Sequence, residues 1–304
     1  MTPSSTPSAG PSGFKVAAAP ISWGVCEVPG WGRVLDAPTV LGEMAGLGVH
    51  ATELGPPGYL PRDPADLRAL LGEYGLNLVG GFLAVVLHED PGAALTAAGE
   101  SAALFAACGA EVLVLAAATG LDGYDERPAL SAAEWATLVG TAAKIRDVAA
   151  EHGLVTVLHP HVGTHVETGA EVERFLADSD LPLCLDTGHL IVGGTDPVAL
   201  AKRYPDRIGH LHLKDVNGKL AEDVRAGRVA YTEAVGAGLY VPLGEGDVDI
   251  DAMVGSVHKA GYDGWYVLEQ DTALSEESPV ERPKRDVATS LAYLRGVLGR
   301  LTAG

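Results

Sequence analysis

Short apolar runs alternate with longer stretches of helical spacing along most of the chain. Runs rich in aliphatic and β-branched residues are typical of buried strands, and eight of them lie at 14–20, 51–54, 76–86, 111–116, 155–159, 183–186, 208–214 and 264–269. Between them, apolar residues recur every three or four positions, which predicts helices at 37–47, 63–74, 92–108, 131–152, 196–203, 249–259 and 283–298. Ser131 and Glu134 have the spacing of a capping box at the start of one of these helices.

This alternation predicts an α/β fold with a parallel sheet, since parallel strands need helical crossovers and become buried on both faces. Eight strand–helix units in about 290 residues fit a single closed (β/α)8 TIM barrel. A doubly wound open sheet is the alternative, but no predicted strand is followed by a Gly-x-Gly-x-x-Gly segment that opens a helix. Residues 215–247 form a long connection, and connections of that length are usually lids or binding elements.

Composition and charge limit the partners and the cellular location that we expect. Met1–Gly13 contains no charged side chain, so we expect a disordered leader there and a single TIM-barrel domain over 14–304. Acidic residues outnumber basic ones 40 to 21, a net charge of −19 that repels nucleic acid and anionic membranes. The three cysteines are too few and too dispersed for a disulfide framework. No segment has the pattern of a secretory signal or a membrane span, so we expect a cytoplasmic protein without nucleic-acid or membrane partners.

Polar side chains gather where the predicted strands end, which is where chemistry occurs in a barrel. Five of the ten histidines fall at the ends of three successive strands, and carboxylates end the second, sixth and eighth strands; the set is Glu53, His159, His161, Asp186, His189, His210, His212, Lys214, Glu269. Mixed nitrogen and oxygen ligands suit Mn²⁺, Co²⁺, Fe²⁺ or Zn²⁺, whereas Mg²⁺ prefers oxygen. Period-two alternation places His210, His212 and Lys214 on one face of the seventh strand, with Lys214 nearest the barrel mouth.

Other residues near these strand ends have either a structural or a functional interpretation. Trp23 either packs in the core or forms a wall against a sugar ring. His165 either faces the substrate or makes a structural hydrogen bond. Cys26 has no evident neighbouring base, so we expect a passive thiol. The remaining histidines lie at helix or loop edges and are expected at the surface: His50, His88, His152, His258.

The motifs at the strand ends resemble those of the xylose-isomerase-like barrel superfamily of sugar isomerases and epimerases. Within it, the chain is most similar to the inosose dehydratase family, through His-x-His-x-Gly-Thr at 159–164, Asp-Thr-Gly-His at 186–189, Asp-Arg-Ile-x-His-x-His-x-Lys-Asp at 206–215 and Gly-x-Gly-x-x-Asp at 244–249. The resemblance covers about residues 16–295. It fails at one place, since that family usually continues its first Ile-Gly-Trp with Asn-Asp, whereas Trp23 is followed here by Gly-Val-Cys. That loop lies at the barrel mouth, so the departure bears on the substrate more than on the metal.

The resemblance implies one divalent metal ion held by four ligands. Carried over by position, the ligands are His159, Asp186, His212 and Glu269, with His161 as the competitor for the place of His159. Mn²⁺ or Co²⁺ is the expected ion, and Zn²⁺, Fe²⁺ and Mg²⁺ are alternatives. Homo-oligomers are common among such barrels, so the resemblance alone favours a homo-oligomer.

The resemblance further implies a lyase that dehydrates a keto-inositol, a small polyol ketone, by removing an α-proton and expelling a β-hydroxide. Glu53, His161, His189 and Lys214 are the catalytic candidates, with His189 or Glu53 favoured as base and the other two as orienting groups or acid. Substrate-binding candidates are Trp23, His165, Gln270. An isomerase or epimerase that uses the same enediolate chemistry is the main alternative. An abasic-site endonuclease of this fold conflicts with the acidic charge, and a non-catalytic sugar-binding protein leaves the ligand set without a purpose.

Overall fold

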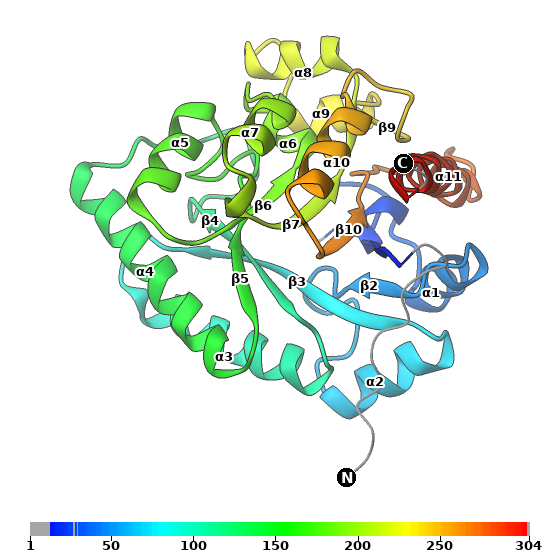
Figure 1. The fold of residues 1–304 in the computed structure, drawn as a ribbon, viewed down its shortest axis with the longest axis horizontal. Coiled ribbons are helices and arrows are strands. Elements are labelled where there is room, and N and C mark those ends of the chain that lie inside the picture. The colour runs from blue at the N-terminus through cyan, green and yellow to red at the C-terminus, as the bar shows by residue number, and fades with distance from the viewer. Residues whose placement is uncertain (1–12, 27, 29, 303–304) are drawn as a thin grey trace.

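Eight parallel strands close into a barrel in the computed structural model, which describes residues 13–26, 28 and 30–302 (Figure 1). Neighbouring strands follow the order β1-β10-β7-β6-β5-β4-β3-β2, and β1 pairs with β10 and with β2 to complete the ring. The barrel strands are β1 (Lys15–Ala18), β2 (Ala51–Glu53), β3 (Asn77–Val86), β4 (Val112–Ala118), β5 (Val155–Leu158), β6 (Leu183–Asp186), β7 (Ile208–Leu213) and β10 (Trp265–Leu268). The predicted (β/α)8 barrel is therefore confirmed, with each predicted strand at its expected place.

Helices surround the barrel, and every helix predicted from the sequence is present. These helices are α1 (Ala37–Gly46), α2 (Pro64–Glu73), α3 (Pro91–Ala107), α4 (Ala132–Glu151), α7 (Pro197–Arg203), α10 (Ile250–Lys259) and α11 (Arg282–Thr302). The Ser131–Glu134 capping box is formed at the start of α4. Among the described residues, no helix combines the length and the apolar character that crossing a bilayer requires.

The sequence patterns missed several short elements. They are the 3-10 helices η1 (Pro20–Trp23) and η2 (Pro205–Arg207), and the helices α5 (Gly169–Asp178) and α6 (Thr187–Val192). The long connection after β7 is also folded, because it contains β8 (Asp215–Val216), α8 (Gly218–Arg225), α9 (Tyr231–Gly236) and β9 (Tyr240–Val241). The leader predicted at Met1–Gly13 lies outside the described residues except for Gly13.

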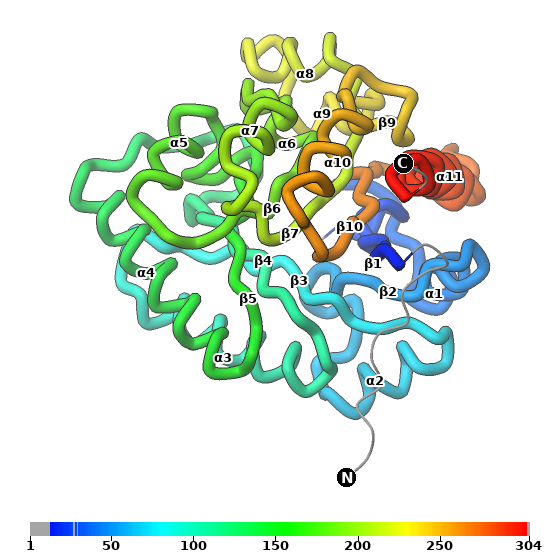
Figure 2. Tube along the Cα trace, viewed as in Figure 1, coloured from blue at the N-terminus to red at the C-terminus, as the bar shows by residue number. Residues whose placement is uncertain are grey.

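The connection after β7 is anchored to the barrel at its base. β8 and β9 pair as a two-stranded antiparallel sheet. The side chain of Asp215 accepts backbone N–H bonds from Gly244, Gly246 and Val248, which ties the two ends of the connection together. A Cβ atom on Gly246 would lie 2.3 Å from Asp215 Oδ1, so only glycine fits there. In Figure 2, α8 and α9 project from the same end of the molecule as β9.

Strand parity separates two apolar layers. One strand face packs against the helices in the large core, for example Leu211 and Leu213 of β7. The opposite parity forms smaller clusters inside the barrel, including Val157 of β5, Cys184 of β6 and Val267 of β10. The residue two positions further along each of these strands also faces inward, and it lies at the carboxyl end of the barrel. Polar side chains at those positions therefore converge on one point.

Candidate metal centre and active site

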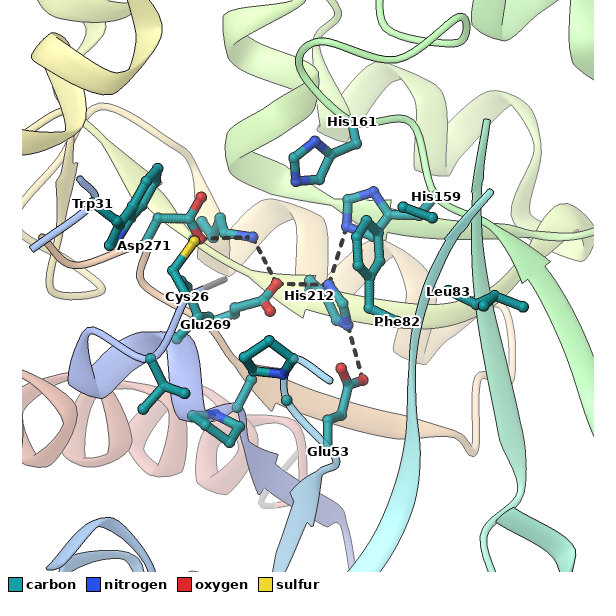
Figure 3. Close-up of a pocket in the computed structure, with 18 of the residues that line it drawn as sticks. Cys26, Trp31, Glu53, Phe82, Leu83, His159, His161, His212, Glu269 and Asp271 are labelled. Atoms are coloured by element: carbon teal, nitrogen blue, oxygen red, sulfur yellow. Dashed lines mark hydrogen bonds and ion pairs between the residues drawn. The ribbon is translucent and has the colours of Figure 1, made fainter. Parts of the chain in front are cut away.

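Four side chains converge at the carboxyl end of the barrel. Ligand atoms of His159, Asp186, His212 and Glu269 all lie within 4.8 Å of one another. Figure 3 shows three of these side chains, His159, His212 and Glu269, pointing toward one another. Three of them follow an inward-facing core residue by two positions, at the ends of β5, β6 and β10. The fourth, His212, lies within β7, where it pairs in register with Asp186 of β6 and with Val267 of β10.

The separations of these atoms suit a small cation. Nε2 of His159 lies 3.2 Å from Nδ1 of His212 and 3.4 Å from a carboxylate oxygen of Asp186. Nδ1 of His212 lies 3.7 Å from the same Asp186 oxygen and 2.7 Å from Glu269. A tetrahedral ion with bonds of about 2.0–2.2 Å places its ligand atoms about 3.3–3.6 Å apart. The observed spacings scatter around that range.

The histidine tautomers are set by contacts on the far side of each ring. Nδ1 of His159 lies 2.9 Å from the backbone oxygen of Pro160, and a carbonyl can only accept, so Nδ1 carries the proton and Nε2 faces the cluster without one. On His212, Nε2 lies 2.9 Å from Glu53 Oε1, which leaves Nδ1 toward the cluster. When both rings are neutral, two imidazole lone pairs and two carboxylates face one another, and this arrangement needs positive charge between them. The donor set therefore fits a divalent metal ion.

Each of the first three residues of the Asp-Thr-Gly-His motif has a structural reason in the contacts that it makes. Oδ1 of Asp186 caps helix α6 by accepting the N–H groups of Gly188 and His189 at 2.9 and 2.8 Å, which leaves Oδ2 for the cluster. The hydroxyl of Thr187 donates to the backbone oxygen of Lys214 at 2.6 Å and accepts from its N–H. A Cβ on Gly188 would lie 2.6 Å from side-chain atoms of Lys214 and Tyr240. The motif thus both aims the ligand and lets β7 approach.

Lys214 supplies positive charge beside the ligands. Its buried Nζ lies 2.7 Å from Asp186 and 2.6 Å from Glu269. Burial alone would lower the pKa of Lys214, but Asp186, Asp271 and Glu269 raise it well above its usual value. Burial would likewise raise the pKa of Glu269, but His212 and Lys214 lower it to about 2. Asp186 and Glu269 are therefore ionised, and the ammonium of Lys214 is charged, at neutral pH.

A cavity of about 270 Å³ opens in front of this cluster. Among the predicted site residues, its lining includes Glu53, His159, His161, His212, Lys214, Glu269. The lining also includes residues that the sequence did not single out as site residues, among them Trp31, Phe82, Tyr124 and Asp271. Asp271 could have been found by parity, since it follows Glu269 by two positions. Phe82 lies within a strand and the other two lie in loops, where no pattern marked them.

The predicted substrate-binding residues and His189 lie away from the cavity wall. Trp23 is fully buried and its indole N–H donates to Glu43, so the structure places it in the core. His165 is 4% exposed and packs edge-on against His88, so His88 is not the plain surface histidine we expected. Gln270 has the opposite parity to Glu269 and lines a separate small pocket. His189 is placed behind His161, with ring centroids 3.7 Å apart.

A buried polar network joins the connection after β7 to the cavity. The hydroxyl of Tyr231, at the start of α9, donates to Asp271 at 2.8 Å and lies 3.2 Å from the hydroxyl of Tyr240. Asp271 in turn lies 3.3 Å from Lys214 Nζ. Backbone N–H of Tyr231 donates to Asp125, which follows the cavity residue Tyr124 in the β4–α4 connection. The folded connection therefore positions one wall of the cavity.

These features define a TIM-barrel enzyme with a candidate divalent-metal centre at the carboxyl end of its strands. Residues 41–297 match the family model of the xylose isomerase-like TIM barrel, and the chain belongs to this family. It is 34% identical to an inosose dehydratase of Geobacillus kaustophilus over 281 residues, which cover 86% of this chain and 89% of that protein. It is also 34% identical over 281 residues to the rhizopine catabolism protein MocC of Rhizobium meliloti, covering 89% and 86% of the two chains.

Solved structures share the fold at much lower identity. An L-ribulose 3-epimerase superimposes with a TM-score of 0.69 at 16% identity, over 95% of this chain and 97% of that one. The IOLI protein, whose structure binds a zinc atom, also gives 0.69, at 14% identity over 94% and 99% of the chains. Both comparisons agree with the barrel described above.

Proposed function

We propose that this protein is a metal-dependent lyase that removes water from an inosose, a keto-inositol ring. The observation that carries the proposal is the convergence of four ligand side chains and a buried lysine on one cavity. Relatives named inosose dehydratase, up to 34% identical over most of the chain, support the choice of reaction. Mn²⁺ or Co²⁺ is the expected ion because the ligands mix imidazole and carboxylate.

The proposed ligands are His159, Asp186, His212 and Glu269. When bound, a divalent ion supplies a Lewis acid that stabilises negative charge on the substrate's ketone oxygen. Lys214 Nζ lies between two of these carboxylates and faces the same cavity, so it orients a second substrate oxygen by hydrogen bonding. Holding the ketone and its neighbour in this way fixes which ring carbon presents its α-proton.

His161 is the proposed base that takes the α-proton. Its Nδ1 lies 2.7 Å from the backbone oxygen of Val162, so Nδ1 carries the hydrogen and Nε2 is free to accept a proton. Burial above all, together with His159 and Lys214, lowers the pKa of His161 to about 3, so the ring is neutral at neutral pH. The ring of His189, tilted by 35° to that of His161, packs against it and holds it in place. The sequence favoured His189 or Glu53, but His161 is the residue that lines the cavity with a free nitrogen.

Asp271 is the proposed acid that protonates the departing β-hydroxyl group. It lines the cavity, and burial raises its pKa. Loss of the α-proton to His161 and of the β-hydroxide, which leaves as water with the proton of Asp271, turns the ring into an α,β-unsaturated ketone. The aromatic side chains Trp31, Phe82 and Tyr124 cover the cavity with apolar surface and keep bulk water away from these groups.

The test is incubation of purified protein with scyllo-inosose and Mn²⁺, with the product followed by mass spectrometry. Dehydration is expected to remove the mass of one water molecule. An unchanged mass with a new ring stereochemistry would replace the proposal by isomerisation or epimerisation, which the altered loop after Trp23 keeps in view because Val25 and Cys26 line the cavity. Chelator-treated protein should be inactive and should recover with Mn²⁺ or Co²⁺. Full turnover after complete metal removal would contradict the proposed mechanism.

A further inference from the structure

Glu53 crosses the barrel interior to reach the histidines of β7. It comes from the end of β2, and in the strand order β1 and β10 lie between β2 and β7. One of its oxygens, Oε1, lies 2.9 Å from Nε2 of His212 and also 2.9 Å from Nε2 of His210. All three side chains are buried. A carboxylate oxygen accepts both contacts, so each histidine carries its proton on Nε2 when the rings are neutral.

The imidazole ring of His212 stands between Glu53 and the proposed metal ligands. Its Nε2 faces Glu53, while its Nδ1 faces Glu269 at 2.7 Å and His159 at 3.2 Å (Figure 3). A histidine binds a metal only through a nitrogen without a proton. Protonation at Nε2 therefore presents Nδ1 to the cluster in the binding form. The same contact also fixes the angle of the ring.

We infer that Glu53 is a positioning residue that sets the tautomer and orientation of His212, with His210 as its second anchor. The inference rests on the proposed metal centre and assigns Glu53 a different part from the base considered at the sequence level. Its Oε1 is engaged by two donors on the side of His212 away from the cluster. Glu53 lines the cavity as His161 and Lys214 do, so the inference is carried by the two contacts of its Oε1 and not by its place in the cavity. A carboxylate that accepts the outer N–H of a metal-binding histidine typically matters about 10–100-fold for metal affinity or activity.

Two substitutions separate positioning from base chemistry. Glu53→Ala removes the acceptor, whereas Glu53→Gln keeps an amide oxygen that can accept the N–H of His212 but cannot act as a base. Glu43→Gln, which alters the partner of Trp23 far from the ligands, is the matched control. The Zn²⁺ dissociation constant of each full-length variant is measured by competition with a chromophoric chelator. Nitrogen-15 spectra of the Zn²⁺-loaded proteins report the protonated nitrogen of each histidine.

We expect Glu53→Ala to weaken Zn²⁺ binding about 10–100-fold and Glu53→Gln to weaken it several-fold less. The spectra should show Nε2–H on His212 in the parent protein and in Glu53→Gln, and a mixture in Glu53→Ala. With inosose, saturating Mn²⁺ should restore turnover of Glu53→Gln. These affinity and tautomer readings hold for Zn²⁺ alone, so they stand or fall separately from the choice of substrate.

Several results would overturn the inference. Unchanged Zn²⁺ affinity in Glu53→Ala, or a parent protein that binds no Zn²⁺, would remove the positioning function. Turnover of Glu53→Gln that stays at least about 100-fold low at every Mn²⁺ concentration, with unchanged affinity, would make Glu53 the base. Two ions per chain that fall to one in Glu53→Gln would instead show that Glu53, His210 and His212 hold a metal themselves. If Glu53→Ala does not fold, Glu53→Gln alone distinguishes these cases.

Discussion

At the scale of single residues, three of the four side chains of the cluster divide their polar atoms between two tasks. Asp186 caps a helix with one oxygen and offers the other to the cluster. His159 and His212 each use one ring nitrogen to hold the ring and leave the second nitrogen free. This division fixes the geometry before any ion arrives. The cost of losing one ligand should therefore appear in binding more than in folding.

Asp186→Asn is expected to lose metal affinity while the barrel stays folded. Asn keeps an oxygen that can cap α6, but an amide NH₂ in place of Oδ2 can neither bind a cation nor accept from Lys214. Loss of a side chain that binds the ion directly should weaken affinity more than loss of a residue that only hydrogen-bonds to a ligand. We therefore expect at least about a 100-fold weaker affinity for Mn²⁺. Titration calorimetry measures the affinity and circular dichroism the fold. Affinity within a few-fold of the parent would exclude Asp186 as a ligand.

Gly188→Ala is expected to strain the contact between α6 and β7. The added Cβ would lie 2.6 Å from Lys214 Cβ and from Tyr240 Cε1. Overpacking of this kind typically costs about 1–3 kcal/mol of unfolding free energy. Gly140→Ala is the control, because Gly140 lies within α4 with open space around it and should become more stable by about 0.5–1 kcal/mol. Urea denaturation of both variants measures the difference, and equal stabilities would contradict the steric account.

At the scale of elements, the connection after β7 supports the wall of the cavity. Tyr231 of its helix α9 donates a hydrogen bond to Asp271. Asp215, at the start of the connection, accepts hydrogen bonds from the segment 244–248. Tyr231 also holds Asp125 of the β4–α4 connection through its backbone N–H. Two connections that are far apart in sequence are therefore latched together over one wall of the cavity.

Tyr231→Phe should loosen this latch. The change leaves Asp271 without its buried hydroxyl donor, and a buried polar group that loses its partner costs about 1–3 kcal/mol. We expect a loss of stability of that order in urea denaturation and a lower kcat with inosose. Tyr204→Phe removes a phenol–carboxylate contact with Glu173 at the edge of the molecule and should cost less. If both variants lose equal stability, the hydrogen bond to Asp271 stabilises the fold no more than the contact between Tyr204 and Glu173.

At the scale of the whole molecule, buried titratable groups make stability depend on pH. Burial lowers the pKa values of His161, His189 and His165, the last to about 4, where His88 adds to the effect. The unfolded chain binds these protons near pH 6.5, so it holds more protons than the folded chain below that pH. Stability is therefore present above pH 6.5 and falls as pH drops toward 4. His212, whose pKa is raised, acts in the opposite sense.

His165→Gln should reduce this acid sensitivity. Gln cannot take up a proton in the unfolded chain, so the slope of unfolding free energy against pH between 6.5 and 4 should become smaller. His152→Gln, at an exposed position on the C-terminal side of α4, is the control and should leave the slope unchanged. Urea denaturation at half-unit pH steps measures both. A slope unchanged in His165→Gln would show that His165 takes up its proton equally well in both states.

The sequence by itself determined the barrel and most of the proposed ligand cluster. Strands and helices were readable because burial on both strand faces and one helix face leaves a period in the sequence. Within an extended strand, side chains alternate strictly, so the common inward face of His210 and His212 followed from parity. The matching motifs then identified Asp186 and Glu269 as their neighbours.

Only the tertiary structure decided where the chain points once the strands end. The alternation of side chains ends where the backbone is no longer extended, and η1 and α6 begin within two residues of the ends of β1 and β6. Trp23 therefore turns into the core and His189 passes behind His161, although both follow strand ends. Tyr124 reaches the cavity and Tyr231 reaches the cavity residue Asp271 from long connections, whose paths are set by contacts such as Asp125 with Tyr231. Such contacts join residues distant in sequence, and no local pattern encodes them.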